Sequence, residues 1–439
     1  MLSNARKSLL TGASAGAATR SRLAIQTRSA SVAANAFKNN GPAKKNQQAK
    51  PKRDKITGSF LPLPAKEINP SIVRNENALE GVSHMGKGFN LSNHVGKPVK
   101  FPNNELAKAY GLPRNVLVDF RLLSAPCFVT RKVTKELVTQ LEDSSKKSSS
   151  ETRAVLTGPS GCGKSYLMLQ AVAHCSVNDW IVLYIPRAHK FVDSSTSYFY
   201  DSRTQTYLQP IVSNQILQRL FSVNKPILEK LRVTEEVAFE KRKNVMPGEP
   251  LKVLFELAST EMHLAPTILT AVLNEIGKQD KYPVLLAVDE LQALYGKTQY
   301  RDQHFQHIKT YHLSVPRLLL EYASGRRIFK RGAFIGAVAP SLTHFPIPLE
   351  LKRQLSPEES SSPYTKTLPG MIEYAKGLKS FKVPEKLEYT EASAIFELWM
   401  KDGALHSNPT DELFLAKYAE SSGNARDFVH RGLLAAQMS

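Results

Sequence analysis

Cysteine is scarce in this sequence, and long apolar runs are absent from it. The 439 residues include only three cysteines, Cys127, Cys162 and Cys175. Three scattered cysteines exclude a disulfide framework and lack the paired spacing of a zinc site, so they suit a reducing compartment. No segment reaches the roughly 20 consecutive apolar residues of a membrane-spanning helix. We therefore expect no membrane span, and either a soluble protein or a member of a soluble assembly.

Acidic residues are missing from the N-terminal segment. No Asp or Glu occurs between Met1 and Arg53, and the whole chain has 59 Lys and Arg against 39 Asp and Glu, a net charge of +20. The first 30 residues are rich in Ser, Ala and Arg and can form an amphipathic helix with Leu9 and Leu10, which is typical of a mitochondrial transit peptide. A disordered basic tail is the alternative. We expect residues 1–30 to be a transit peptide. We expect the basic segment after it to bind polyanions.

Residues 31–122 show little sustained periodicity. Lysines are frequent in the first part of this segment, and proline and asparagine then interrupt it in "FLPLP", "EINPS" and "GLPRN". Such a composition favours a segment that wraps a partner over one that builds a core of its own. We expect a basic linker and an extended N-terminal arm over this range.

From residue 123 the sequence pattern becomes that of a folded domain. Four short apolar segments, residues 153–157, 179–186, 284–288 and 332–338, alternate with longer helical patterns. This alternation predicts an α/β fold in which helices flank a parallel sheet, and we assign it to residues 123–385. Three segments with helical spacing follow and predict a C-terminal helical lid over residues 386–439.

A phosphate-binding loop follows the first of these strands. "GPSGCGKS" fits the spacing G-x-x-x-x-G-K-[ST], with a strand before it and a helix after it. The loop comprises Gly158, Pro159, Ser160, Gly161, Cys162, Gly163, Lys164 and Ser165. In such a loop backbone N–H groups surround the β-phosphate, Lys164 reaches the β- and γ-phosphates, and Ser165 ligates Mg²⁺. A chance match in a glycine-rich turn is the alternative, and the flanking strand and helix favour nucleotide binding.

Two acids end the strand at residues 284–288. Five apolar residues lead directly into Asp289 and Glu290. Ligands of open α/β sheets bind at the carboxyl ends of the strands, so Asp289 is placed to hold Mg²⁺ through water and Glu290 to orient an attacking water. Acids also occur at helix N-termini for electrostatic reasons alone. The upstream phosphate loop favours the metal site.

Three further features each allow more than one interpretation. Cys162 is either a small passive side chain within the loop or a redox group. Arg426 follows "SSGN", and it either reaches the phosphates from the lid or is an exposed arginine near a helix start. The basic cluster "SGRRIFKRG", residues 324–332, either contacts nucleic acid or lies on a solvated face, or it donates an arginine finger to another subunit. The absence of other motor motifs favours RNA contact.

Four segments together resemble the death-associated protein 3 family, the P-loop protein of the mitochondrial small ribosomal subunit, and the chain looks like a fungal member. They are "LTGPSGCGKSYLMLQAVAH", "VLYIPRAHKFVDSSTSYFYDSRTQTYLQP", "LLAVDELQAL" and "SSGNARDFVHRGL". The second segment is the most specific, because generic P-loop ATPases have no reason to carry it. The resemblance extends over residues 55–437.

The resemblance implies an AAA+-like P-loop NTPase fold that binds GTP or GDP with Mg²⁺. It implies a place in the mitochondrial matrix, in the head of the small ribosomal subunit. The partners would be small-subunit rRNA and ribosomal proteins, with contacts toward the large subunit and no homo-oligomer. Carried onto this chain, it gives residues 158–165 the phosphates, Asp289 the metal, Glu290 the catalytic role and Arg426 the role of a lid arginine.

The sequence contains no recognisable motif for binding the guanine base. Small G proteins read guanine through Asn-Lys-x-Asp, and the nearest match here, "NKPI", has Ile227 in place of the aspartate. The region from Phe128 to Thr130, before the first strand of the domain, is our hypothesis for base recognition.

Two functions from different classes fit these observations. In the first, the protein is a structural ribosomal component that bound nucleotide stabilises and that supports mitochondrial translation. In the second, it is a slow GTPase or ATPase switch that gates assembly or subunit joining. Both require Lys164 and Asp289, and only the second requires Glu290. Without an arginine finger, which contributes about a thousandfold or more to turnover, hydrolysis is expected to be slow.

Overall fold

The computed structural model describes residues 79–102, 104–239, 243–356, 367–405 and 409–434. All of them belong to one unit, residues 56–439. The expected transit peptide and residues 31–78 of the expected arm lie outside the described residues.

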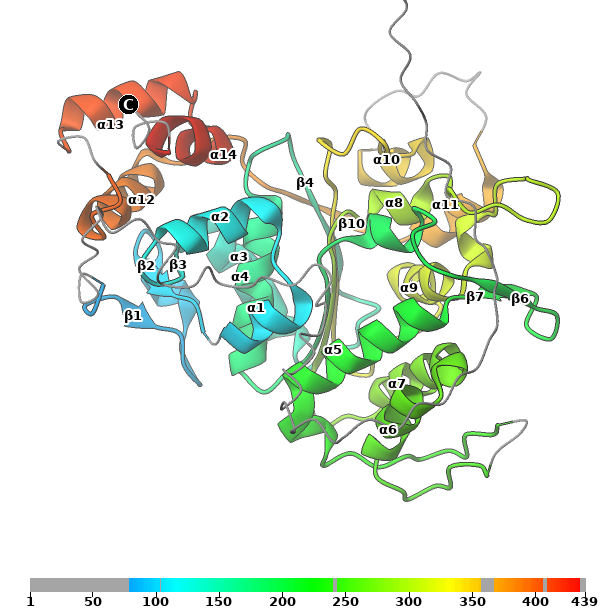
Figure 1. The fold of residues 1–439 in the computed structure, drawn as a ribbon. Helices are drawn as coiled ribbons and strands as arrows, with labels where there is room; N and C mark the ends of the chain where they lie inside the picture. The colour runs from blue at the N-terminus through cyan, green and yellow to red at the C-terminus, as the bar shows by residue number, and fades with distance from the viewer. Residues whose placement is uncertain (1–78, 103, 240–242, 357–366, 406–408, 435–439) are drawn as a thin grey trace, which may run out of the picture. The chain divides into compact units, whose positions relative to one another are not determined.

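A five-stranded parallel sheet with the order β10-β4-β9-β8-β5 forms the centre of this unit (Figure 1). Its strands are β4 (Arg153–Thr157), β5 (Ile181–Ile185), β8 (Val284–Val288), β9 (Gly332–Ala337) and β10 (Lys379–Lys382). Every residue of β5, β8 and β9 is buried, which explains their continuous apolar sequences, because a parallel sheet is covered on both faces. The expected α/β fold with a parallel sheet is therefore confirmed, and β10 is an additional edge strand.

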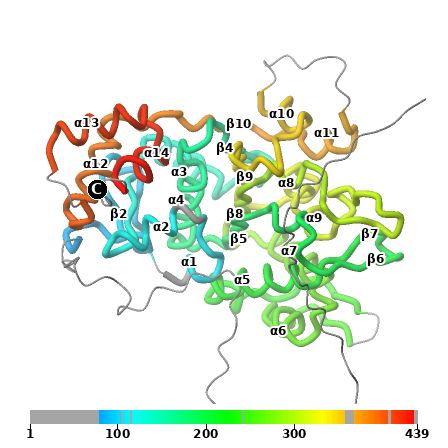
Figure 2. Tube along the Cα trace, turned by 45° about the horizontal axis from the view of Figure 1, so that its top comes forward, coloured from blue at the N-terminus to red at the C-terminus, as the bar shows by residue number. Residues whose placement is uncertain are grey.

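Helices cover both faces of the sheet (Figures 1 and 2). Helices α3 (Lys132–Ser144) and α4 (Lys164–Val177) lie on one face. Helices α5 (Pro210–Leu228), α7 (Ala265–Lys278) and α9 (Ser314–Ser324) lie on the other. The remaining elements of this region are η3 (Ala188–Phe191), β6 (Phe199–Asp201), β7 (Thr206–Leu208), α6 (Lys252–Thr260), η4 (Met262–Leu264), α8 (Gln292–Tyr295), η5 (Thr310–His312), α10 (Leu349–Leu355) and α11 (Pro369–Ala375). None of the helices in the described residues is long and apolar enough to cross a membrane.

Residues 79–122 differ from the extended arm that their composition predicts. They form β1 (Ser83–His84), η2 (Leu91–His94), β2 (Pro98–Lys100), α1 (Asn104–Tyr110) and α2 (Arg114–Leu122), and β1 and β2 join β3 (Cys127–Val129) in a small sheet. Leu91, Val99 and Tyr110 are each at most 2% exposed. The Tyr110 hydroxyl donates a hydrogen bond to the Val182 carbonyl, 2.5 Å away in β5. These apolar residues follow no single period because several short elements, rather than one long element, bring them to the core.

The C-terminal residues form α12 (Tyr389–Lys401), α13 (Asp411–Glu420), α14 (Ala425–Asp427) and the π-helical turn η6 (Phe428–Leu433). Their buried residues, including Trp399, Phe414 and Phe428, make a cluster with Leu123 and Cys127 that is separate from the large cluster around the sheet. We call these two clusters the C-terminal core and the sheet core. In both views the C-terminal helices lie beside β2 and α2, so the two ends of the described chain share one core.

Candidate nucleotide-binding site

The loop of residues 158–163 connects β4 to α4 at the carboxyl edge of the sheet. Gly161 has φ +82°, and a Cβ added there would lie 2.4 Å from Asn424 Oδ1. Gly158 has φ +144°, and a Cβ there would lie 2.9 Å from the Val383 carbonyl oxygen. Both positions need glycine because the backbone conformation and the close neighbours exclude a side chain. Local sequence and packing therefore agree on a tight loop at this place.

Lys164 lies inside the loop. The side chain is 7% exposed, and its Nζ donates to the carbonyl oxygens of Gly158, at 2.8 Å, and Pro159, at 2.6 Å. Burial lowers the pKa of this ammonium, and the nearby Cys162 and Asp289 oppose that change. Phosphate oxygens could replace these carbonyls as charge-assisted acceptors.

Ser165 and Asp289 face each other across the sheet edge. Asp289 is 2% exposed, and burial raises its pKa to about 7, while the nearby Ser165 hydroxyl opposes the rise. No group of three or more His, Cys, Asp or Glu that could hold a metal occurs among the described residues. One carboxylate and one hydroxyl are a poor complete site but fit Mg²⁺, which commonly takes its other ligands from phosphates and water. A cation here would also neutralise a buried carboxylate.

Glu290 does not stand free in the site. Its carboxylate pairs with Nδ1 of His189 in η3, just after β5, and both side chains are largely buried. The Glu290 backbone has φ +59° and its N–H donates to Asp289 Oδ1 at 2.8 Å. The residue proposed to orient water is thus held by a histidine that the motif analysis missed, although the histidine lies within the family-specific segment at residues 182–210.

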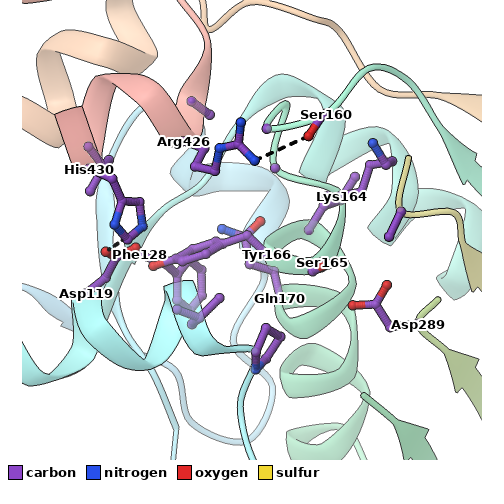
Figure 3. Close-up of a pocket in the computed structure, with 18 of the residues that line it drawn as sticks. Asp119, Phe128, Ser160, Lys164, Ser165, Tyr166, Gln170, Asp289, Arg426 and His430 are labelled. Atoms are coloured by element: carbon purple, nitrogen blue, oxygen red, sulfur yellow. Dashed lines mark hydrogen bonds and ion pairs between the residues drawn. The ribbon is translucent and has the colours of Figure 1, made fainter. Parts of the chain in front are cut away.

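The C-terminal segment contacts the phosphate loop directly. The Arg426 backbone N–H donates to the Gly161 carbonyl at 3.0 Å, and its guanidinium donates to Ser160 Oγ at 3.3 Å (Figure 3). Asn424 Nδ2 donates to the Ser160 carbonyl at 3.0 Å. The structure therefore brings Arg426 to the loop, as the lid interpretation expects. It adds Asn424, whose only sequence signal was its place in "SSGN".

Arg131 supports the loop from the opposite side. It is 9% exposed, and its guanidinium donates to the Cys162 carbonyl at 2.9 Å and to Glu391 of α12 at 2.8 Å. Cys162 is 1% exposed; its carbonyl accepts from Arg131, and its thiol lies 3.5 Å from the Lys164 ammonium. No local sequence pattern could have identified the pair of Arg131 and Glu391, because the two residues are 260 positions apart.

A cavity of about 730 Å³ adjoins these groups. Lys164, Ser165, Asp289, Glu290 and Arg426 line one part of it. Asp119, Phe128, Tyr166, Trp399 and His430 line another. Of the region suggested for base recognition, Phe128 and Val129 line the cavity and Thr130 does not. In "NKPI", Asn224 is occupied by hydrogen bonds to the Val182 and Leu220 backbone.

The basic cluster at residues 324–332 makes contacts within the chain. Arg326 pairs with Glu373, Arg327 with Glu321, and Arg331 donates to the carbonyls of Ser145 and Asp280. These contacts hold the three arginines against the chain, and the RNA contact expected for this cluster stays a prediction.

The fold and this site define an α/β protein with a parallel sheet that carries a phosphate-loop sequence at its carboxyl edge. A family model described as "Mitochondrial ribosomal death-associated protein 3" matches residues 128–431, and the chain belongs to this family. It is 25% identical over 371 residues to "Small ribosomal subunit protein mS29" of Neurospora crassa, covering 76% of this chain and 78% of that one.

Relatives with the same description occur in other organisms. The identity is 27% over 293 residues for the Schizosaccharomyces pombe protein, covering 64% of this chain and 60% of that one. It is 27% over 230 residues for the Bos taurus protein, covering 52% of this chain and 56% of that one. The chain thus covers less than two thirds of the bovine relative's length.

Proposed function

We propose that this chain is a structural component of the mitochondrial small ribosomal subunit, in the matrix, and that it holds GTP or GDP with Mg²⁺ as a fixed part of its fold. The names of its relatives support the ribosomal role. The nucleotide role rests on one observation above all: Asn424 and Arg426 of the C-terminal helices pack directly on the phosphate-loop backbone. A nucleotide in the adjoining cavity would contact both the sheet core and the C-terminal core.

In this proposal, different residues bind the phosphates and the metal ion. Lys164 and the loop N–H groups bind the phosphates, and Arg426 adds a second positive charge from the lid. Ser165 and Asp289 hold Mg²⁺, which neutralises charge on the phosphates. Binding that occurs only in the folded state stabilises it by about 4 kcal/mol when the free ligand is a thousandfold above Kd. That is a large share of the stability of an ordinary domain.

The strand order supports the AAA+-like P-loop assignment and the description of the C-terminal helices as a lid. Strand β9 lies between β4, which carries the phosphate loop, and β8, which carries Asp289. The net charge of +20 supports rRNA as a partner, together with neighbouring ribosomal proteins and contacts toward the large subunit. A protein embedded in this way has no need of a homo-oligomer.

A slow GTPase or ATPase switch is the second candidate function. Glu290 lines the cavity, which favours it, but its carboxylate is paired with His189. Glu290→Gln separates the two functions, because a fixed nucleotide needs no catalytic carboxylate. We expect this variant to assemble normally with its nucleotide. A stalled assembly intermediate would support the switch instead.

The test of the structural proposal is the nucleotide content of the native particle. We expect small subunits carrying the wild-type chain, or the control Lys401→Ala on the exposed face of α12, to release one guanine nucleotide in denaturant, identified by chromatography. Lys164→Ala should lose the nucleotide and enter small subunits poorly. Normal assembly of Lys164→Ala without nucleotide would refute the structural role.

A further inference from the structure

The cavity beside the phosphate loop extends well past the groups that would hold phosphate. Figure 3 shows Asp119 and His430 at the end away from Asp289, with Phe128 and Tyr166 between. A nucleotide whose phosphates lie on Lys164 and Ser165 would place its base in this direction. Aromatic rings at such a position can stack on or border a base.

The polar side chains around this end are mostly occupied. The Tyr166 hydroxyl donates to the Cys127 carbonyl at 3.1 Å. Gln170 donates to the Val129 carbonyl at 3.0 Å and accepts from Thr134 at 2.7 Å. Arg131 is held by Glu391 and the phosphate loop. These groups have little capacity left for a ligand.

Asp119 is different. Its carboxyl group on α2 is 14% exposed, and Oδ1 is buried without a hydrogen-bond partner among the described residues. Nε2 of His430 in η6 lies 3.6 Å from Oδ1, beyond hydrogen-bond distance, and burial lowers the pKa of this histidine, which favours its neutral form. Burial raises the pKa of the carboxyl group to about 7. A buried acceptor without a donor is costly, so a small movement that brings this carboxyl group, which lines the cavity, to a ligand donor would be favourable.

We propose that Asp119 selects guanine by accepting hydrogen bonds from the N1–H and 2-amino groups of the base. This inference rests on the proposed function, since it presumes that the loop binds a nucleotide. Guanine presents two adjacent donors on this edge, and donors beside the carboxyl group favour its ionised form, which only accepts hydrogen bonds. Adenine presents the N1 lone pair and a C–H there, so it would leave the carboxylate unpaired and facing another acceptor. Asp119 thus supplies the carboxylate that "NKPI" lacks, from a different element.

The test replaces one acceptor oxygen of the Asp119 side chain with an N–H donor. Asp119→Asn keeps an acceptor for N1–H but presents an N–H to the 2-position, which suits the 2-oxo group of xanthine. The substitution removes a carboxyl group that burial already penalises, so the variant is expected to fold. Calorimetry on the full chain with Mg²⁺ would compare the diphosphates of guanosine, inosine, xanthosine and adenosine. Asp143→Asn, on the exposed face of α3, is the matched control.

We expect wild type and Asp143→Asn to prefer the guanosine diphosphate over the adenosine and xanthosine diphosphates by about tenfold to a hundredfold. The inosine diphosphate, which lacks the 2-amino group, should bind with intermediate affinity. Asp119→Asn should lose affinity for the guanosine diphosphate by a similar factor and gain affinity for the xanthosine diphosphate.

The outcomes separate this inference from the function on which it rests. A wild-type chain that binds none of the four diphosphates would refute nucleotide binding itself. A wild-type chain that binds guanosine and adenosine diphosphates equally would refute base selection alone. So would an Asp119→Asn variant that keeps its guanine preference, or one that loses all four ligands to the same degree.

Discussion

Single side chains tie distant parts of this chain together, and Arg131 is the clearest case. The guanidinium lies between Glu391 of α12 and the Cys162 carbonyl of the phosphate loop, and Glu391 is 3% exposed. The next residue, Lys132, also pairs with a glutamate, Glu388, but both of those side chains are largely exposed. A comparison of these two neighbouring ion pairs therefore tests how burial changes the contribution of an ion pair to stability.

We expect Arg131→Ala to lower the free energy of unfolding by about 3 kcal/mol, because it leaves the buried Glu391 carboxylate without its cationic partner and with only the backbone N–H groups of Lys132 and Glu388 as donors. Lys132→Ala should cost less than about 1 kcal/mol, as exposed ion pairs do. Urea denaturation of both variants measures the difference. Equal losses would show that Arg131 is not an energetic link.

Asp289 makes a second prediction at this scale. The pKa of this carboxyl group in the folded protein, about 7, lies above its ordinary value of 3.8. The folded state therefore favours the protonated form, and the stability contributed is present at low pH and lost as pH rises through about 7. Without nucleotide, we expect the melting temperature of wild type to fall from pH 5 to pH 8 more than that of Asp289→Asn.

Mg²⁺ with guanosine diphosphate should reduce that pH difference, since the metal favours the ionised carboxylate. Thermal melts of wild type and Asp289→Asn, with and without the ligand, provide the measurement. An identical pH dependence in the two proteins would mean that Asp289 does not titrate in this range.

At the scale of elements, the contact between the phosphate loop and α14 controls the site. A Cβ on Gly161 would lie 2.4 Å from Asn424 Oδ1, whereas one on Gly88, which has a similar positive φ of +75°, would meet nothing within 4 Å. Gly88→Ala should therefore report backbone strain alone, about 1 kcal/mol. Gly161→Ala should cost more and weaken nucleotide binding as well. Unfolding and calorimetric titration measure the two effects, and equal costs with unchanged affinity would contradict the role of this contact.

The sequence predicted those elements whose own residues form a recognisable pattern. The buried strands β4, β5, β8 and β9 are apolar runs, and the acids at 289 and 290 follow one of them. Strand β10 was missed because "KSFK" at a sheet edge has no apolar run. Residues 79–122 were misread as extended because their burial depends on the later domain. His189, Arg131 and Asn424 could not be paired with their partners, since each contact joins residues about 100 to 260 positions apart.

The whole unit has two cores, and its two tryptophans report one each. Trp180 belongs to the sheet core, and Trp399 belongs to the C-terminal core and lines the cavity. A nucleotide that contacts both cores should couple their unfolding. Phenylalanine substitutions at either position would give variants with a single fluorescent reporter.

Without nucleotide, we expect the Trp399 signal to change at a lower urea concentration than the Trp180 signal, because fewer residues form the C-terminal core. With guanosine diphosphate and Mg²⁺, the two transitions should move together and to higher urea. Coincident transitions in both conditions would show that the cores already unfold as one without the ligand.

The order of the site along the chain has a consequence for how the protein is made. Asp119 and Arg131 precede the phosphate loop, while Asn424, Arg426 and His430 come after the last strand of the sheet. A chain that is synthesised and imported N-terminus first can complete its sheet before these later residues arrive. Under the proposed function, stable nucleotide retention would therefore mark a chain delivered through residue 430, and a truncated copy would fail to keep the ligand.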